Sequence, residues 1–524
     1  MTQLATQPAC IRHTELPGTS RLFADFTYHF QHVAKFYRHN PHDPASYGRA
    51  AAEIQYPGDR RAALVDALRA QNGDSESLRR LAEPGTVAVV TGQQVGLFGG
   101  PAYTIFKAAT AARLARKLTD DGIPAVPVFW LATEDHDFAE VNHAWVYDAH
   151  GESQMVKVDA PAALAGRQHP VGAMAVAAPP IDELRRVLAG LPFADDVVAL
   201  VAETYRPGVS MGEAFRALLQ KLCGHLGLLL LDPLDPAIRK IGAPFIVDAL
   251  KAAPELKASL LERNKELTAA GYHAQVHIEP KTSLFFLLEN GERVGLRRKD
   301  ADYAALADRA ADISPNAVLR PVMQDYLLPT VAYVGGPGEL AYFAQSHVIY
   351  ERLLGRMPVM LARAGFTLMD QRSAKTLARF GLMTTDTFVR PEVLKDQISC
   401  KLVPASLVQT MEQTASNVTR QIAGLKDELL RFDPTLAAAL EKSEAKIAYQ
   451  MGKMRGKTER EAIRRDERAA ADARHLSSML FPHRHLQERF YSILPFLAQH
   501  GLELTERLTD AIVLDCPDHQ VFAI

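Results

Sequence analysis

Runs of consecutive apolar residues recur along the first two thirds of the chain, and several are followed by apolar positions at helical spacing. A continuous apolar run bounded by turn residues is typical of a strand that is covered on both faces. Such runs alternating with helices predict an α/β fold with a doubly wound parallel core. The predicted strands are residues 87–90, 125–132, 227–231, 330–334 and 357–361.

Long stretches that are not simple crossovers interrupt this pattern at about residues 151–225 and 255–320. We interpret both as insertions into the core. The second contains an apparent hairpin, because apolar runs flank Asn290-Gly291, a strong short-range hairpin signal. A further strand is predicted just before it, at residues 275–278.

The spacing of apolar positions changes to 3 and 4 from about residue 406 onward, and Asp433-Pro434 interrupts it once. Two long helices around a proline break predict an antiparallel α-helical coiled-coil arm. The predicted organisation is therefore a core with insertions over residues 1–385, the arm over 386–479, and a segment over 480–524 that packs back on the core.

Composition narrows the class of protein. The formal net charge of the 524 residues is −2, so no global field attracts nucleic acid or an anionic membrane. No apolar run approaches the roughly 18 residues of a membrane span. The four cysteines form no CxxC pair, and residues 1–20 lack the pattern of a signal peptide. These features predict a cytoplasmic protein whose partners are neither nucleic acid nor membrane.

The densest glycine segment follows the first predicted strand and precedes a predicted helix; residues 91–101 read TGQQVGLFGGP. Backbone N–H groups and the helix dipole favour an anion at such a turn. A plain tight turn with a solvated lysine is the alternative. No Gly-Lys-Ser/Thr follows, which disfavours a P-loop. The candidate nucleotide- or substrate-binding residues are Gly92, Gln93, Gln94, Gly99, Gly100, Thr104 and Lys107.

Four ionisable residues, Glu134, Asp135, His136 and Asp137, follow the second predicted strand. Ligands of open α/β sheets bind outside the carboxyl ends of the strands. The four are therefore candidate catalytic residues that can bind an amine, accompany Mg²⁺ or deprotonate a nucleophile. An acidic helix cap is the alternative. His136 and His143 have no familiar zinc spacing, so no metal ligands are assigned.

A second Gly-Gly-Pro turn follows the fourth predicted strand, and Gly335 and Gly336 are candidates for another wall of the same cleft. A tight turn is again the alternative. His347 on the next helix is a candidate acid–base group or a packed polar residue. Arg320 and Arg363 can each bind a carboxylate bidentately, or serve in a structural ion pair.

Several blocks together resemble the bacillithiol-biosynthesis cysteine-adding enzyme family. The blocks run in order along the chain, at residues 91–107, 129–137, 271–276, 314–325, 333–339 and 481–489. The resemblance implies a Rossmann-like nucleotide-binding core and a coiled-coil arm that mediates homodimerisation. It also implies a ligase that joins the carboxylate of L-cysteine to the amine of glucosaminyl malate, giving bacillithiol. The resemblance assigns no catalytic residues; that Arg320 and Arg363 pair with the malate carboxylates is a prediction from guanidinium chemistry.

Forming an amide from a free carboxylate requires an activated acyl group, which ATP can supply as an acyl adenylate or an acyl phosphate. ATP or ADP is therefore the expected nucleotide, with Mg²⁺ as its companion. Three alternatives stay open: a nucleotidyl transferase or synthetase acting on another amine, a metal-dependent hydrolase built on residues 134–137, and a coiled-coil scaffold with a vestigial nucleotide fold.

Overall fold

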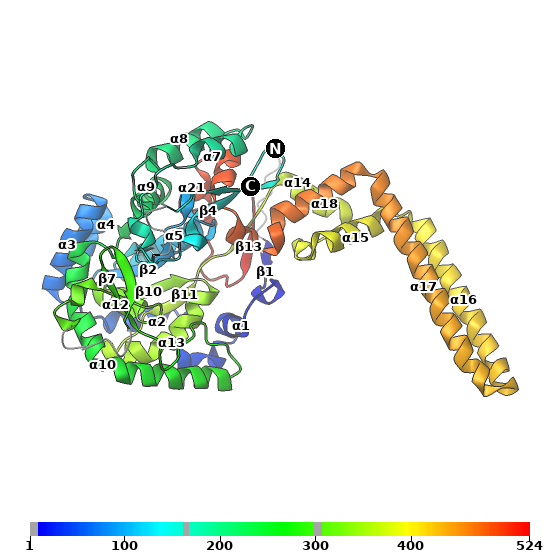
Figure 1. Ribbon diagram of the computed structural model, residues 1–524, viewed down its shortest axis with the longest axis horizontal. Helices are drawn as coiled ribbons and strands as arrows, with labels where there is room; N and C mark the ends of the chain where they lie inside the picture. Colours follow the sequence, from blue (N-terminus) through cyan, green and yellow to red (C-terminus); the bar gives the residue numbers. More distant parts are fainter. Residues whose placement is uncertain (1–8, 161–166, 297–305) are drawn as a thin grey trace. The chain divides into compact units, whose positions relative to one another are not determined.

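The computed structural model describes residues 9–160, 167–296 and 306–524 (Figure 1). The chain forms two compact units. Unit 1 contains the residues up to Leu368 together with 488–522 and Ile524, and unit 2 contains 369–487 and Ala523. Unit 2 is thus inserted, in sequence, between two parts of unit 1.

Unit 1 is built on a five-stranded sheet with the order β11-β10-β2-β3-β6, in which every neighbouring pair is parallel. Numbered along the chain, these strands lie in the order 5-4-1-2-3, which is the doubly wound arrangement predicted from the sequence. The order reverses between β2 and β10, which defines the switch point of the sheet. The strands are β2 (Val87–Gln94), β3 (Ala125–Ala132), β6 (Leu229–Leu231), β10 (Thr330–Gly335) and β11 (Val359–Ala362).

Alternate residues of the strands supply two apolar cores, one on each face of the sheet. Ala88 and Val90 of β2 belong to the larger core, whereas Val87 and Val89 belong to the smaller one. Period-two alternation within a continuous apolar run therefore covers both faces, as expected for a parallel sheet. The larger core includes α1 (Arg21–Tyr28), α3 (Gly58–Asn72), α4 (Glu76–Ala82), α10 (Pro236–Ala269), α12 (Arg320–Leu327) and α13 (Pro337–Leu353); the smaller includes α2 (Ala45–Ala52) and α5 (Tyr103–Asp120).

The first strand is longer than predicted. β2 continues through Gln94, so the expectation of a turn beginning at Thr91 is wrong; full pairing with β3 extends the strand to its last residue. The predicted helix that follows begins at Tyr103, two residues after Pro101. Pro101 instead forms an isolated bridge with Ser492, which draws the turn into the interior.

The insertions carry small hairpins and short helices. The hairpin at Asn290-Gly291 is confirmed, with both residues at positive φ (53° and 78°). The strand predicted at 275–278 is wrong, because no ladder forms there. Parts of both predicted insertions, 161–166 and 297–305, lie outside the described residues. The elements are β4 (His143–Tyr147), β5 (Ser153–Lys157), α6 (Phe138–Val141), α7 (Ile181–Leu188), α8 (Ala194–Thr204), α9 (Met211–Cys223), β7 (Phe285–Glu289), β8 (Glu292–Gly295) and β9 (Ile313–Pro315).

The two ends of unit 1 meet in a second small sheet. β1 (Ala9–Ile11) pairs antiparallel with β13 (His519–Ala523), which also neighbours β12 (Phe366–Met369). The C-terminal part reaches β13 through three short helices. They are α19 (Gln487–Phe490), α20 (Leu494–His500) and α21 (Leu504–Ala511).

Unit 2 is helical, and the predicted antiparallel hairpin is confirmed. Its two long helices run side by side as a coiled coil (Figure 1). The break falls where predicted, because Asp433 caps the second helix through the N–H of Thr435 and Pro434 occupies its first position. The helices are α14 (Gln371–Phe380), α15 (Pro391–Leu402), α16 (Ala405–Phe432), α17 (Pro434–Arg465) and α18 (Glu467–Leu480). Within the described residues, none of the helices combines the length and apolar character required to cross a bilayer.

Candidate functional site

A cavity of about 510 Å³ opens at the switch point of the sheet, beyond the carboxyl ends of β2, β3 and β10. This is where doubly wound sheets bind ligands, and the volume is in the range of small-molecule sites. The lining includes Gly92, Gln93 and Gln94 of β2 and the first turn of α13. Other lining residues are Tyr103, Lys107, Trp130, Glu134, Asp135, Glu140, Gln275, Arg293, Asn316, Arg320, Tyr333, Gly336, Glu339, Tyr342, Arg363 and Arg489.

Gly92 sits in the narrowest part of the wall. It pairs with Trp130 of β3, and a Cβ placed on it would lie 2.8 Å from the Trp130 carbonyl oxygen. This distance is too short for a side chain, so the position requires glycine for close approach rather than for a positive φ. The tight pairing brings the ends of β2 and β3, and the side chains that follow them, to one edge.

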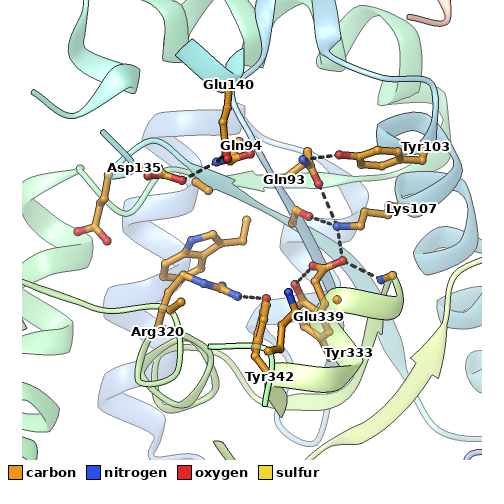
Figure 2. A pocket seen from close by; sticks show the side chains of 18 of the residues that line it. Gln93, Gln94, Tyr103, Lys107, Asp135, Glu140, Arg320, Tyr333, Glu339 and Tyr342 are labelled. Carbon is orange, nitrogen blue, oxygen red and sulfur yellow. Dashed lines mark hydrogen bonds and ion pairs between the residues drawn. The ribbon is translucent and has the colours of Figure 1, made fainter. Parts of the chain in front are cut away.

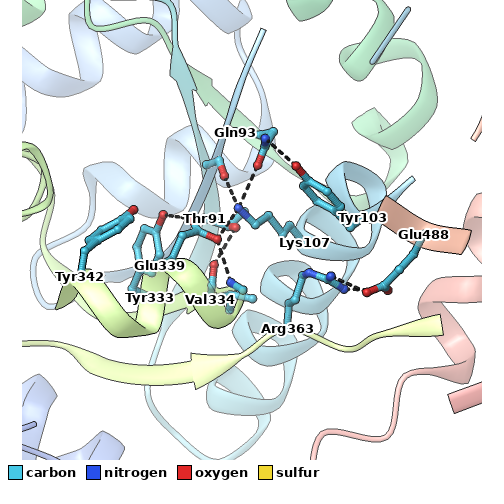
Figure 3. Close-up of polar contacts among 12 residues, drawn as sticks. Thr91, Gln93, Tyr103, Lys107, Tyr333, Val334, Glu339, Tyr342, Arg363 and Glu488 are labelled. Carbon is cyan, nitrogen blue, oxygen red and sulfur yellow. Dashed lines mark hydrogen bonds and ion pairs between the residues drawn. The ribbon is translucent and has the colours of Figure 1, made fainter. Parts of the chain in front are cut away.

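Lys107 and Glu339 form a buried ion pair across the switch point, with Lys107 Nζ 2.5 Å from Glu339 Oε2 (Figure 3). Lys107 Nζ also donates to the Gly92 carbonyl at 2.8 Å and to Gln93 Oε1 at 3.0 Å. Burial lowers the pKa of Lys107, and the neighbouring Glu339 opposes that shift. The ammonium therefore joins the end of β2 to the start of α13.

Glu339 completes a cap on α13. Its carboxylate accepts hydrogen bonds from the Gly336 N–H at 2.7 Å and from Tyr333 Oη at 2.7 Å. Burial alone would raise the pKa of Glu339, but Lys107 and the Gly336 N–H lower it below its usual range. An internal carboxylate thus already holds the N-terminus of α13, where the sequence favoured a bound anion.

One side of the cavity is acidic. Gln94 Nε2 donates to Asp135 Oδ2 at 2.6 Å and to Glu140 Oε2 at 2.9 Å, so one amide gathers both carboxylates (Figure 2). Glu140 is exposed and Asp135 is partly buried. Carboxylates in this setting can bind an amine, accept its proton or accompany a divalent cation.

The other members of the acidic run have protein partners. Glu134 is buried and its carboxylate lies 2.6 Å from Arg239 Nη1. His136 Nδ1 lies 3.1 Å from Arg293 Nη1 and points to that guanidinium rather than lining the cavity. Asp137 accepts a hydrogen bond from the Glu140 N–H as the N-cap of α6. Glu134 and Asp135 line the cavity, whereas the other two catalytic candidates, His136 and Asp137, do not.

The facing side of the cavity is cationic. Arg320 donates to Tyr342 Oη at 3.0 Å (Figure 2). It also donates to Gln324 Oε1 at 2.9 Å, and both acceptors are neutral side chains. Arg489 is exposed and lies 5.6 Å from the centre of the Tyr103 ring. Within the described part of the chain, neither guanidinium forms an ion pair with a carboxylate, so both are available to an anionic ligand.

Arg363 is occupied by the protein itself. Its Nη1 and Nη2 donate to Glu488 Oε2 at 2.8 Å and Oε1 at 2.5 Å, and both side chains are buried (Figure 3). The structural alternative considered for Arg363 is therefore the arrangement observed. Arg363 still borders the cavity, where it closes one end.

Besides His136 and Asp137, five of the binding candidates lie outside the set of lining residues: Gly99, Gly100, Thr104, Gly335 and His347. The glycine turn packs into the interior, because the Phe98 N–H donates to Tyr205 Oη and the Ala102 N–H donates to the Tyr491 carbonyl. Its backbone donors are directed into the protein, away from the cavity.

His347 faces a different part of unit 1. Its Nδ1 lies 3.3 Å from the Arg263 guanidinium and its Nε2 lies 3.5 Å from Glu351. Burial, with the nearby Arg263 charge, lowers the pKa of His347 to about 4, so the ring is neutral at physiological pH. It serves as packing between α10 and α13.

Sequence reasoning missed several lining residues. Arg489 stands in a block that the family resemblance had picked out, but nothing in its spacing tied it to the sheet. Glu140 and Arg293 carry no local signal, because they reach the cavity through α6 and the β7–β8 hairpin. Among the described residues, no group of three or more metal-ligating side chains is present.

Two models of one protein family together match nearly the whole chain. Residues 9–364 match the model of the bacillithiol biosynthesis BshC N-terminal Rossmann-like domain, and residues 366–524 match that of the BshC C-terminal coiled-coil domain. A protein of Solibacter usitatus, named "putative cysteine ligase BshC", is 53% identical over 98% of this chain and 99% of its own length. Proteins of the same name from Koribacter versatilis and Symbiobacterium thermophilum are 36% and 33% identical over 99% and 92% of this chain, covering 100% and 94% of their own lengths.

Proposed function

Because the chain belongs to the bacillithiol-biosynthesis BshC family, we propose that it is a cysteine ligase that forms a carbon–nitrogen bond in the cytoplasm. The bond joins the carboxylate of L-cysteine to the amine of glucosaminyl malate, and the product is bacillithiol. The observation that carries the proposal is the pair of oppositely charged walls in the switch-point cavity.

The two walls fit the two ends of the amine substrate. Asp135 and Glu140 are placed to receive the sugar amine and to accept the proton it loses when it attacks. Arg320 and Arg489 are placed to bind the malate carboxylates, because a guanidinium matches a carboxylate in shape and charge. Arg489 thus takes the part that the sequence had given to Arg363, whose guanidinium is engaged by Glu488.

Lys107 and Glu339 act as positioning residues. Their ion pair fixes the Gly92 carbonyl and the Gln93 side chain, and Gln93 Nε2 in turn donates to Tyr103 Oη at 3.1 Å. The pair therefore sets the geometry of the floor between the two charged walls. Groups held in this way need no reorganisation when charge develops during reaction.

We propose ATP as the source of free energy, since a free carboxylate does not condense with an amine unaided. ATP would supply activation of the cysteine carboxylate. Mg²⁺ would accompany the nucleotide phosphates, because Asp135 and Glu140 are assigned to the amine. The buried glycine turn and the carboxylate-capped α13 offer no open phosphate cradle, so the nucleotide phosphates would contact side chains of the cavity.

We also propose a homodimer through the coiled-coil arm. α16 contains no buried residue in its 28 positions, although its apolar spacing is regular. Exposed apolar side chains such as Leu425, Phe432 and Ile447 lie along the hairpin. A second copy of the arm would cover them, and a two-fold pair is the commonest closed assembly. Light scattering that gives the mass of one chain, about 57.6 kDa, would contradict this proposal.

The activity is tested by incubating the full chain with ATP, Mg²⁺, cysteine and glucosaminyl malate, followed by mass spectrometry of the thiol product. Bacillithiol is expected only when all components are present. Product from a different amine, with none from glucosaminyl malate, would favour the transferase or synthetase alternative. Activity that needs a tightly bound transition metal would favour the hydrolase.

Arg489→Ala tests the assignment of the cationic wall. We expect the KM for glucosaminyl malate to rise by about tenfold or more, since loss of a charge-assisted contact costs about 1.5–3 kcal/mol. The KM for cysteine should change little. Arg116→Ala, which removes an exposed guanidinium from the surface of α5, is the matched control. Equal KM values for Arg489→Ala and the control would remove Arg489 from the substrate site.

A further inference from the structure

Two cysteines from opposite ends of the sequence meet at the edge of unit 1. Cys10 lies in β1 and Cys516 lies three residues before β13, and their Sγ atoms are 3.5 Å apart across 506 positions of sequence. Cys10 is exposed and Cys516 is partly buried. Their approach is a tertiary contact, because nothing in the local sequence brings them together.

The backbone holds this approach in place. Cys10 is opposite Gln520 in the β1–β13 ladder, and the Gln520 N–H donates to the Gly365 carbonyl at 2.9 Å. Tyr28 Oη donates to Asp518 Oδ1 at 2.6 Å and accepts from the His13 N–H at 2.7 Å. Both strands are therefore fixed on either side of the two sulfur atoms, and a disulfide requires only a small adjustment of the side chains.

A second cavity of unit 1, of about 800 Å³, reaches this pair. Cys516 is one of its lining residues, together with Asp515 and Asp518. A small molecule can thus approach Cys516 from the cavity, whereas Cys10 faces solvent. The other two cysteines do not combine these features in the described residues, because Cys223 is buried and Cys400, on unit 2, has no cysteine neighbour.

We propose that Cys10 and Cys516 form a thiol–disulfide exchange site that reacts with low-molecular-weight disulfides. The Cys516 thiolate attacks one sulfur of the small disulfide, which releases one small thiol and leaves a mixed disulfide on Cys516. The Cys10 sulfur then attacks Cys516 Sγ and releases the second small thiol. Two protein thiols are oxidised, one small disulfide is reduced to two thiols, and the two protein protons pass to the released thiolates.

The order of attack follows from the surroundings of the two sulfurs. Burial by its neighbours, the contact with Cys516 and the charge of Asp518 raise the pKa of Cys10 to about 11. The order of attack itself rests on access, because Cys516 lines the second cavity, from which a small disulfide can approach, and Cys10 is not among the residues that line it. The resulting disulfide ties β1 to the segment that precedes β13, at the rim of the second cavity. This site is independent of the ligase proposal.

The test uses glutathione disulfide with the full reduced chain, followed by alkylation and tryptic digestion without reduction. The expected product is a linked pair of peptides, residues 1–12 and 508–524, with two of the four thiols lost. Cys10→Ser should accumulate glutathione on Cys516, whereas Cys516→Ser should leave Cys10 largely unmodified. Cys400→Ser is the matched control and should give the linked pair in full yield.

Three results would overturn the proposal. They are glutathione on both cysteines without the linked pair, a linked pair that joins two different chains on a non-reducing gel, and a link that involves Cys400. Oxidation should also raise the thermal midpoint of unit 1. Dithiothreitol should reverse that rise, and Cys10→Ser should not show it.

Discussion

Replacing Glu488 with glutamine should destabilise unit 1 strongly. The change keeps the size of the side chain but removes the charge that faces Arg363, whose side chain is 5% exposed. The Phe366 N–H, which donates to Glu488 Oε2 at 3.0 Å, can keep an acceptor. What is lost is the counter-ion of a guanidinium that is almost entirely buried.

Two independent routes give the magnitude. Removing one partner of a buried ion pair typically costs 3–5 kcal/mol. The pKa gives a similar figure: burial acts to raise it, but Arg363 and the surrounding donors lower it from 4.5 to about 2. This shift corresponds to about 3 kcal/mol of stability at pH 7. Because the folded pKa is depressed, that contribution is present above pH 4.5 and is lost as the pH falls towards 2.

Denaturant unfolding monitored by tryptophan fluorescence measures this effect. Both tryptophans, Trp130 and Trp145, fall in unit 1, so the signal follows the unit that contains Glu488. The free energy of unfolding of Glu488→Gln should be about 3 kcal/mol below that of the unmodified chain at pH 7. That difference should shrink to less than half by about pH 3. Glu506→Gln, an exposed change on α21, is the control and should lose less than about 0.5 kcal/mol.

A difference below about 1 kcal/mol at pH 7 would refute the assigned magnitude. A difference that stays constant from pH 7 to pH 3 would refute the assigned charge state, since a neutral Glu488 has no proton to gain. The control separates both outcomes from a general effect of charge removal in the C-terminal segment.

Other positions give similarly sharp expectations. Lys107→Met leaves Glu339 without its cation, so it should lower ligase turnover and reduce the free energy of unfolding by about 3 kcal/mol. Lys117→Met, an exposed change on the same helix, is the control. Equal turnover in the two variants would contradict the positioning role of Lys107. Gly92→Ala forces a Cβ against Trp130 and should cost about 1–3 kcal/mol in denaturant unfolding. Gly58→Ala is the control, because a Cβ there meets nothing within 4 Å, and it should leave the free energy of unfolding nearly unchanged. An equally small loss of stability in Gly92→Ala would show that the β2–β3 contact is not tight.

The sequence predicted the class of the sheet, doubly wound and parallel, but not the order of its strands. Apolar runs and helical spacing predicted a doubly wound sheet, and the Asp433-Pro434 break placed the helical hairpin, because both signals are local. The end of β2 was misjudged because glycine is common in turns and depleted in strands. Pairing with β3 overrides that preference at Gly92, where only glycine fits against Trp130.

The sequence placed the candidate site at the correct edge of the sheet, but several of the residues that line it are not the ones predicted. Position at a strand end predicted Asp135, since it follows directly from topology. The glycine turn at 99–100 was expected to face a ligand, yet Tyr205 and Tyr491 take up its neighbourhood. Such contacts join segments hundreds of residues apart, and no spacing in the sequence reveals them.

The division of unit 1 has a consequence for how the chain is made. Arg363 emerges from the ribosome well before Glu488, because residues 369–487 are translated between them. Glu488 follows Arg363 by 125 positions, so at about 5–20 residues per second the delay is roughly 6 to 25 s. During that time Arg363 lacks its carboxylate partner, and β1 lacks the strand with which it pairs. Unit 1 can therefore form the Arg363–Glu488 ion pair and the β1–β13 ladder only after the helical insert and β13 have been synthesised.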